Sequence, residues 1–214
     1  PADVTLIDAS FDGTGMSAAM ASAFQVLRGA ALTVKGGRFD NAQRLHFKSW
    51  GDALVLERVW VGKYGLGATK ESHNEAIFIN GGRFEARRCT FDSRGGPNAQ
   101  TIGQTAQINL EAEIAPIEVR IDGGTMIGAR DLGLLFPIQA RARNFDVTIR
   151  VRNLACQRGT SSSFVGPTEE KGRVIIIDEG GNTDLDTGAP VDWSRPATPD
   201  LRARLAQIAA LSTL

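Results

Sequence analysis

The sequence predicts an all-β solenoid, a fold in which short strands stack along one axis. Four segments share a pattern in which a strand with alternating apolar residues meets a pair of glycines. The pairs begin at positions 36, 81, 123 and 180, and in three of the four a large apolar residue follows: Phe39, Phe84 and Met126. A recurring strand-corner unit is typical of solenoids, and we interpret each interval as two coils of ~20–25 residues, with extra loop in the last. The alternative is four unrelated turns in a β-sandwich, because Gly-Gly after a strand is common turn chemistry.

Length and charge narrow the class of protein further. The chain has 214 residues, enough for one sizeable core and short for two. Its 24 basic and 24 acidic side chains balance, so no overall field attracts nucleic acid or an anionic membrane, and we expect no nucleic-acid partner. No stretch reaches the ~20 apolar residues of a membrane span, and the opening residues lack a signal peptide. We therefore expect no transmembrane segment and synthesis in the cytoplasm of a host cell.

Residues 1–30 predict a strand followed by a helix. Val4–Ala9 has the alternation of a strand, and residues 11–15 have turn composition. In Met16–Arg28, apolar residues at helical spacing share one face: Met16, Met20, Ala23, Phe24 and Leu27. A helix placed here would cover the open end of a stack of strands, which otherwise exposes unpaired backbone and core.

Residues 31–188 predict the body of the solenoid. Strand patterns follow one another at Leu32–Val34, Leu45–Phe47, Ala53–Val61, Ala76–Ile79, Arg88–Phe91, Ile108–Leu110, Ile117–Ile121, Val147–Cys156 and Val174–Ile177. A shift in the alternation at Asn153 indicates a bend. Three long polar loops, Gly62–Glu75, Asp92–Gln107 and Gln157–Gly172, follow analogous strands. Loops that leave equivalent corners gather on one side, so we expect a polar face there for binding or for contacts between subunits.

Residues 189–214 predict a linker and a C-terminal helix. Thr198, Pro199 and Asp200 form a good helix start, and Pro199–Leu211 then places leucine and isoleucine side chains on one face. This helix either covers the far end of the body or contacts a partner. The predicted organisation is thus a capped N-terminal segment (1–30), a solenoid body (31–188) and a C-terminal segment (189–214).

No catalytic motif is readable in the chain, and we assign no catalytic residue and no cofactor. Asp184 and Asp186 are spaced like oxygen ligands, but a single copy of such a motif is a weak calcium signal, and we assign no metal site. Cys89 and Cys156 lie in strands, where we expect small buried side chains and no disulfide. Acidic and arginine side chains could converge in a groove, as polysaccharide cleavage requires, but we expect them at corners and on the surface.

Aromatic side chains provide a carbohydrate signal, because sugar rings stack on flat apolar faces. Trp50 precedes a turn, Tyr64 and His73 share the first long loop, and Trp193 lies in the linker. We predict that carbohydrate binds at these four residues. Trp60 lies in the strongest strand, and we expect it in the core.

The opening of the chain resembles a known family. Asp12–Val34, with the sequence DGTGMSAAMASAFQVLRGAALTV, and the GGRF that follows resemble the entry into right-handed parallel β-helix domains of phage tailspikes and the wider pectate-lyase-like superfamily. There, a segment like DGxTDDTxAIQxAL forms a helix, and a strand ending at a glycine corner comes next. The start is matched by Asp12, Gly13 and Thr14, and the helix pattern by Ala18, Ala19, Phe24 and Leu27. Gly15 and Met16 stand where the family has an acidic pair.

The resemblance spans about residues 7–39 and implies a single-stranded right-handed parallel β-helix. It also implies a structural and receptor-binding fibre or spike component of a phage or phage-like particle that attaches to cell-surface polysaccharide. We would then expect other virion proteins as partners and a homo-oligomer, with a trimer favoured. The alternative on the same scaffold is a polysaccharide lyase or glycoside hydrolase, since one fold hosts both. A β-sandwich carbohydrate-binding module is a third possibility.

Overall fold

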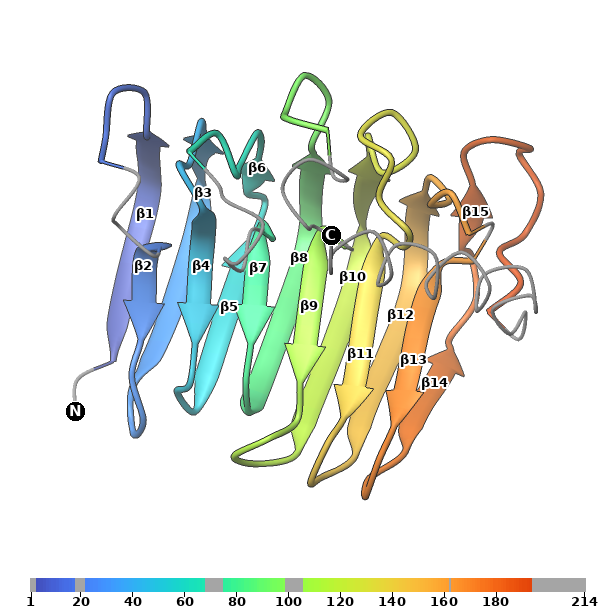
Figure 1. The fold of residues 1–214 in the computed structure, drawn as a ribbon. Coiled ribbons are helices and arrows are strands. Elements are labelled where there is room, and N and C mark those ends of the chain that lie inside the picture. The colour runs from blue at the N-terminus through green and yellow to red at the C-terminus, as the bar shows by residue number, and fades with distance from the viewer. Residues whose placement is uncertain (1–2, 18–21, 68–74, 99–105, 162, 194–214) are drawn as a thin grey trace, which may run out of the picture.

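The computed structural model describes residues 3–17, 22–67, 75–98, 106–161 and 163–193, and these form two parallel β-sheets that face each other (Figure 1). Sheet A contains β1 (Val4–Asp12), β3 (Ala31–Asp40), β5 (Ala53–Glu57), β6 (Trp60–Val61), β8 (Gly82–Asp92), β10 (Ile117–Ile127), β12 (Val147–Cys156), β14 (Val174–Asp178) and β15 (Thr183–Asp184). Sheet B contains β2 (Ser22–Val26), β4 (Leu45–Ser49), β7 (Ile77–Ile79), β9 (Ile108–Glu111), β11 (Ile138–Ala142) and β13 (Val165–Glu169).

The chain passes alternately from one sheet to the other. We define a unit as one strand of sheet A together with the strand of sheet B that follows it in the chain. The sheet A strand of a unit is either continuous or interrupted. Successive units add neighbouring strands in sequence order, and all the strand pairings within the two sheets are parallel. Buried apolar side chains from both sheets form one continuous cluster between them. The predicted all-β class with parallel stacking is confirmed.

A left-handed corner recurs at one register position of sheet A. The residues with positive φ there are Asp8, Gly36, Arg58, Arg88, Gly123, Asn153 and Gly181. The strand registers place these residues side by side, since the residues just before them are paired: Lys35 with Glu57, Glu57 with Arg87, and Arg87 with Asp122. The corner interrupts the alternation, so that Val151 and Leu154 both point inward. The bend predicted at Asn153 is confirmed.

The spacing of these corners corrects the predicted repeat. Positions 8, 36, 58, 88, 123, 153 and 181 are separated by as few as 22 residues (36 to 58) and as many as 35 (88 to 123). The interval from Gly123 to the last glycine pair contains two units, as expected. Between Gly36 and Gly123 there are three units instead of four, because Gly81 and Gly82 lie at the opposite corner, where the chain enters β8 from sheet B.

The prediction of a helix over Met16–Arg28 is wrong for the part that the structure describes, residues 16–17 and 22–28. Ser22–Val26 is strand β2, which pairs in parallel with β4. The reason is tertiary packing: the Phe24 ring lies 5.4 Å from the rings of both Phe39 and Phe47, and these contacts override a helical spacing built largely from small residues. The predicted helix Pro199–Leu211 lies outside the described residues.

Two further sheet B strands were not predicted, β11 and β13. The second lies inside the predicted loop Gln157–Gly172, so the connection from sheet A to sheet B there ends at residue 164. Both cysteines are free and buried, as predicted, and burial raises the pKa of the Cys89 thiol to about 11. In the part of the chain that is described, no helix has the length and apolar character needed to span a membrane.

Replacing Gly124 by alanine should destabilise the protein far more than replacing Gly180. Both glycines have left-handed φ, 107° and 92°, so either alanine carries strain of about 1 kcal/mol. At Gly124 the new Cβ would also meet the Cys89 carbonyl of the neighbouring strand, whereas nothing lies within 4 Å at Gly180. We expect a loss of about 1 kcal/mol for Gly180→Ala and about 3 kcal/mol or more for Gly124→Ala in urea unfolding. Equal losses would show that close approach of the strands is not the constraint.

Candidate functional site

Carboxylates recur where the strands of sheet A end. Strands β1, β3 and β8 end at Asp12, Asp40 and Asp92, each directly after an inward-facing phenylalanine. Asp12 and Asp40 are paired in register. Gly62 follows β6, which lies between β3 and β8, so it separates Asp40 from Asp92. With neighbouring parallel strands about 4.8 Å apart, the three carboxylates occupy a short row at the edge where the loops begin.

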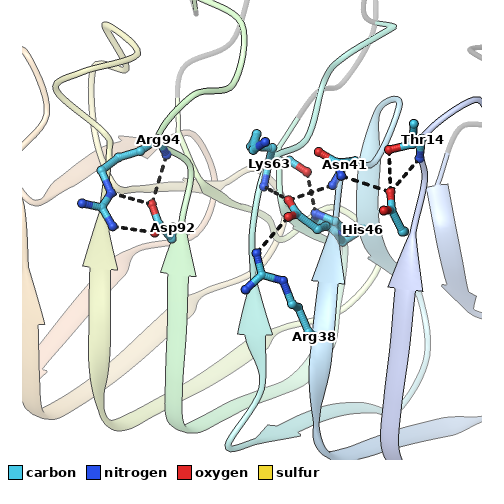
Figure 2. Close-up of polar contacts among 9 residues, drawn as sticks. Thr14, Arg38, Asn41, His46, Lys63, Asp92 and Arg94 are labelled. Carbon is cyan, nitrogen blue, oxygen red and sulfur yellow. Dashed lines mark hydrogen bonds and ion pairs between the residues drawn. The ribbon is translucent and has the colours of Figure 1, made fainter.

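Asp40 is the central carboxylate of this row by register, and Figure 2 shows Arg38, Asn41 and Lys63, which surround it. Its Oδ1 accepts hydrogen bonds from the backbone N–H groups of Asn41 and Lys63, both at 2.9 Å. Its Oδ2 accepts one from Arg38 Nη2 at 3.1 Å. The side chain is buried, so it fixes the starts of two loops and orients the exposed Arg38 guanidinium.

Asp12 is held by its own loop and by Asn41, which follows β3, and Asp92 is held by its own loop. Asp12 Oδ1 accepts hydrogen bonds from the Thr14 N–H at 2.9 Å and from Asn41 Nδ2 at 3.0 Å. The Thr14 hydroxyl also donates to Asp12 Oδ1 and contributes most, and the three hydrogen bonds together lower the pKa of Asp12 to about 2. Arg94 binds Asp92 through Nε at 2.9 Å and Nη2 at 2.8 Å, and this pairing lowers the pKa of Asp92. Both groups are carboxylates at neutral pH.

Trp60 lies among these polar groups, on the outer side of sheet A. In register it is flanked by Arg38 on one strand and Thr90 on the other. The Arg38 guanidinium carbon lies 3.5 Å from the centroid of the Trp60 ring, a stacking distance. A Cβ at Gly62 would meet both the Trp60 ring and Asp40 Oδ1, so the glycine makes room for the ring. The expectation that Trp60 belongs to the core is wrong, because the left-handed corner at Arg58 reverses the alternation along this strand.

His46 contacts the backbone of Lys63, one of the residues that bind Asp40. Its Nε2 lies 2.9 Å from the Lys63 carbonyl, so the neutral imidazole donates from Nε2, and its Nδ1 accepts no hydrogen bond in the described residues. The ring is fully buried beside Phe11 and Tyr64. Burial lowers its pKa to about 4. The prediction that His46 is structural is therefore supported by its surroundings.

The site combines an aromatic ring with planar polar side chains. Carboxylate, amide and guanidinium groups bind sugar hydroxyls in fixed directions, and the indole ring adds an apolar contact. The pKa is lowered at Asp12 and Asp92, as it is at Asp122 beside Arg152, so these three groups are carboxylates at neutral pH. Among the described residues, no three His, Cys, Asp or Glu side chains are grouped so that they could hold a metal ion. Asp184, part of the weak calcium motif, accepts hydrogen bonds from Arg158 and Thr187 instead.

The predicted carbohydrate residues are not brought together. Trp50 follows β4 and is half-buried, with the Lys48 ammonium 4.3 Å from its ring centroid. Tyr64 is only 2% exposed and lies beside His46, before the start of the next strand of sheet B. Trp193 is partly buried in the core at the C-terminal end of the stack, 5.6 Å from Phe164. His73 lies outside the described residues.

A repeated dipeptide could have identified the carboxylate row from the sequence. Phe-Asp occurs at 11–12, 39–40 and 91–92, each time between a strand and a turn residue. A fourth copy at 145–146 belongs to a different corner, before β12. The long connections after β6 and β8 leave from this same edge, as predicted, so the row lies at the base of the loop face (Figure 1).

No protein-family model matches this chain, and neither the curated proteins nor the solved structures contain a match.

His46 should make the fold sensitive to mild acid. The folded imidazole has a pKa of about 4, against about 6.5 when unfolded, so between these values only the unfolded chain takes up the proton. The free energy of unfolding should therefore fall as pH drops from 6.5 to 4, by up to about 3 kcal/mol. We expect the loss between pH 7 and pH 4.5 to be clearly smaller in His46→Gln, which retains a donor for the Lys63 carbonyl. An imidazole that titrates near pH 6.5 in the folded protein by NMR would contradict this.

Proposed function

We propose that this protein is a right-handed parallel β-helix that binds cell-surface polysaccharide without cleaving it, as a fibre or spike component of a phage or phage-like particle. Binding is proposed at the cluster of Arg38, Trp60, Asp40 and Asp92. The observation that carries the proposal is the half-buried Trp60 ring, on which the Arg38 guanidinium stacks close to the carboxylates of Asp40 and Asp92.

The stacking of units supports the β-helix. From β1 to β13 each unit contributes one continuous or interrupted strand to sheet A and one strand to sheet B, consecutive units are neighbours, and the corner residues align in one column. Parallel crossovers are right-handed in nearly all known sheets, which favours that hand here. The segment that forms a helix in the tailspike family contains strand β2 in this chain, so this part of the resemblance is lost. The proposed particle role therefore rests on the stack of strands and on the resemblance at residues 12–14.

The electrostatics favour binding over cleavage. Glycoside hydrolysis needs one protonated carboxylic acid at working pH beside a second carboxylate. Asp12 and Asp92 are instead stabilised as anions, Asp12 by hydrogen bonds from Thr14 and Asn41 and Asp92 by Arg94. Carboxylates fixed in this way are hydrogen-bond acceptors in permanent positions, which suits recognition of hydroxyl groups.

Attachment through one such site would be weak, and repetition would strengthen it. A single aromatic contact contributes about 0.5–1.5 kcal/mol beyond the area it buries. A surface polysaccharide repeats its sugar unit, and a particle presents several copies of its fibre, so individually weak contacts add through effective concentration. Other virion proteins would anchor the chain to the particle.

Trp60→Ala should weaken polysaccharide binding about tenfold while leaving the fold intact, since the ring lies outside the core. Binding would be measured by calorimetry against a panel of purified capsular and O-antigen polysaccharides. Trp50→Ala is the matched control, because Trp50 is also half-buried and lies beside a cation, but at the end of β4. We expect the control to bind like the parent protein.

Three results would contradict the proposal: no retention of any polysaccharide, equal losses in the two variants, or shortening of the polysaccharide by the parent protein. Shortening would favour the lyase or glycoside hydrolase alternative. Circular dichroism of both variants would establish that a loss of binding is not a loss of fold.

A further inference from the structure

Among the described residues, none covers the N-terminal end of the stack. A hollow of about 620 Å³ lies between the first strands of the two sheets, and Leu32 of the next unit contributes to its lining. It is lined by Val4, Leu6, Phe24, Gln25, Val26, Leu27, Arg28, Ala30, Ala31 and Leu32. These residues belong to β1, β2, the corner between β2 and β3, and the start of β3. The hollow is thus the interior of the first unit, where the side chains of a further unit would otherwise pack.

Apolar side chains surround this opening and are exposed. Ile7 is 70% exposed, Leu27 is 61% exposed and Val4 is 46% exposed. Ile7 also departs from the pattern of its row across sheet A. The residues at the same register in later units are all charged: Lys35, Glu57, Arg87, Asp122 and Arg152. Only the outermost unit places a large apolar side chain there, which indicates a surface that becomes buried in an assembly.

The two edge strands at this end are less protected than those at the other end, although β1 contains the left-handed corner at Asp8. Within the described residues, β1 pairs only with β3 and β2 pairs only with β4. Neither strand contains proline or lysine, the residues that commonly protect exposed edges. Unpaired backbone groups along an exposed edge favour addition of another strand.

The opposite end is protected. Strand β13 contains Pro167, which cannot donate to a further strand, and exposed charged residues follow it. The Val174 N–H at the start of β14 is already bound by Glu169 Oε1, at 2.8 Å. Val191 and Trp193 pack onto the core beyond the last complete unit. The two ends of the stack are therefore chemically different.

We infer that the open end binds the same end of a second copy of this chain across a two-fold axis. A single added strand would cover one edge, whereas the exposed apolar residues lie on both sheets and at the corner between them. A partner that covers this whole end must present two strand edges and an apolar interior of the same cross-section. The same end of a second copy has these features. Head-to-tail addition is disfavoured because the other end is protected. Same-end contact produces a closed dimer, in which the edges of the two copies run antiparallel.

This contact is separate from the proposed polysaccharide site and survives if that proposal fails. The resemblance favours a trimer, whereas the chemistry of the two ends favours a dimer. Leu27 and Val4 would enter the shared hollow, and Ile7 would be covered at its rim.

The test is sedimentation equilibrium of the whole chain between 1 and 100 µM. We expect a dimer, and at least a hundredfold weaker association for the double variant Ile7→Lys/Leu27→Lys. The matched control is Leu66→Lys/Phe145→Lys, since these residues are exposed to 42% and 39% and lie away from the open end. The control should remain dimeric. A monomeric parent, a trimer, a growing polymer, a dimeric end variant or a monomeric control would each overturn the inference.

Hydrogen exchange of the parent protein gives a second measurement that does not depend on a variant that folds. Raising the concentration from 1 to 100 µM should slow exchange of the β1 and β2 amides at least tenfold, while the amides of β13 and β14 remain unchanged. Protection that appears at β13 and β14 instead would place the contact at the other end and overturn the inference.

Discussion

The structure depends on one backbone conformation repeated at one register position of sheet A. A left-handed residue there turns the strand and keeps both of its halves in contact with the same core. Glycine and asparagine adopt this conformation at little cost, but Arg58 and Arg88 also adopt it, at about 1–2 kcal/mol each. A cost of this size persists only where the surroundings compensate for it. Here the compensation is parallel pairing with an identical corner on each side.

The same registration arranges the outer side chains. Lys35, Glu57, Arg87, Asp122 and Arg152 alternate in sign across successive strands of sheet A. Opposite charges that face each other directly contribute roughly 0.2–1 kcal/mol per pair, and like charges oppose pairing by similar amounts. The outer row therefore reinforces the order of the units that the inner apolar rows also require.

The strands could be predicted from the sequence because apolar and polar residues alternate along a strand that is buried on one side. Sequence reasoning failed where local pattern and tertiary contact disagree. The spacing in Met16–Arg28 fits a helix, but Phe24 is fixed by two rings from later strands, and no local pattern contains that contact. The strand β13 contains proline and glycine, which usually signal a loop, and it is stabilised by pairing with β11.

The candidate site was missed for a related reason. A wide aromatic in a strong strand usually belongs to the core, and Trp60 would do so if β5 and β6 were one regular strand. The corner at Arg58 shifts the alternation by one residue, so Val59 and Val61 point inward and Trp60 points outward. One residue in a left-handed conformation thus decides which side chains become core and which become surface. That conformation cannot be read from an arginine, although it is evident from glycine at the equivalent position of the neighbouring unit.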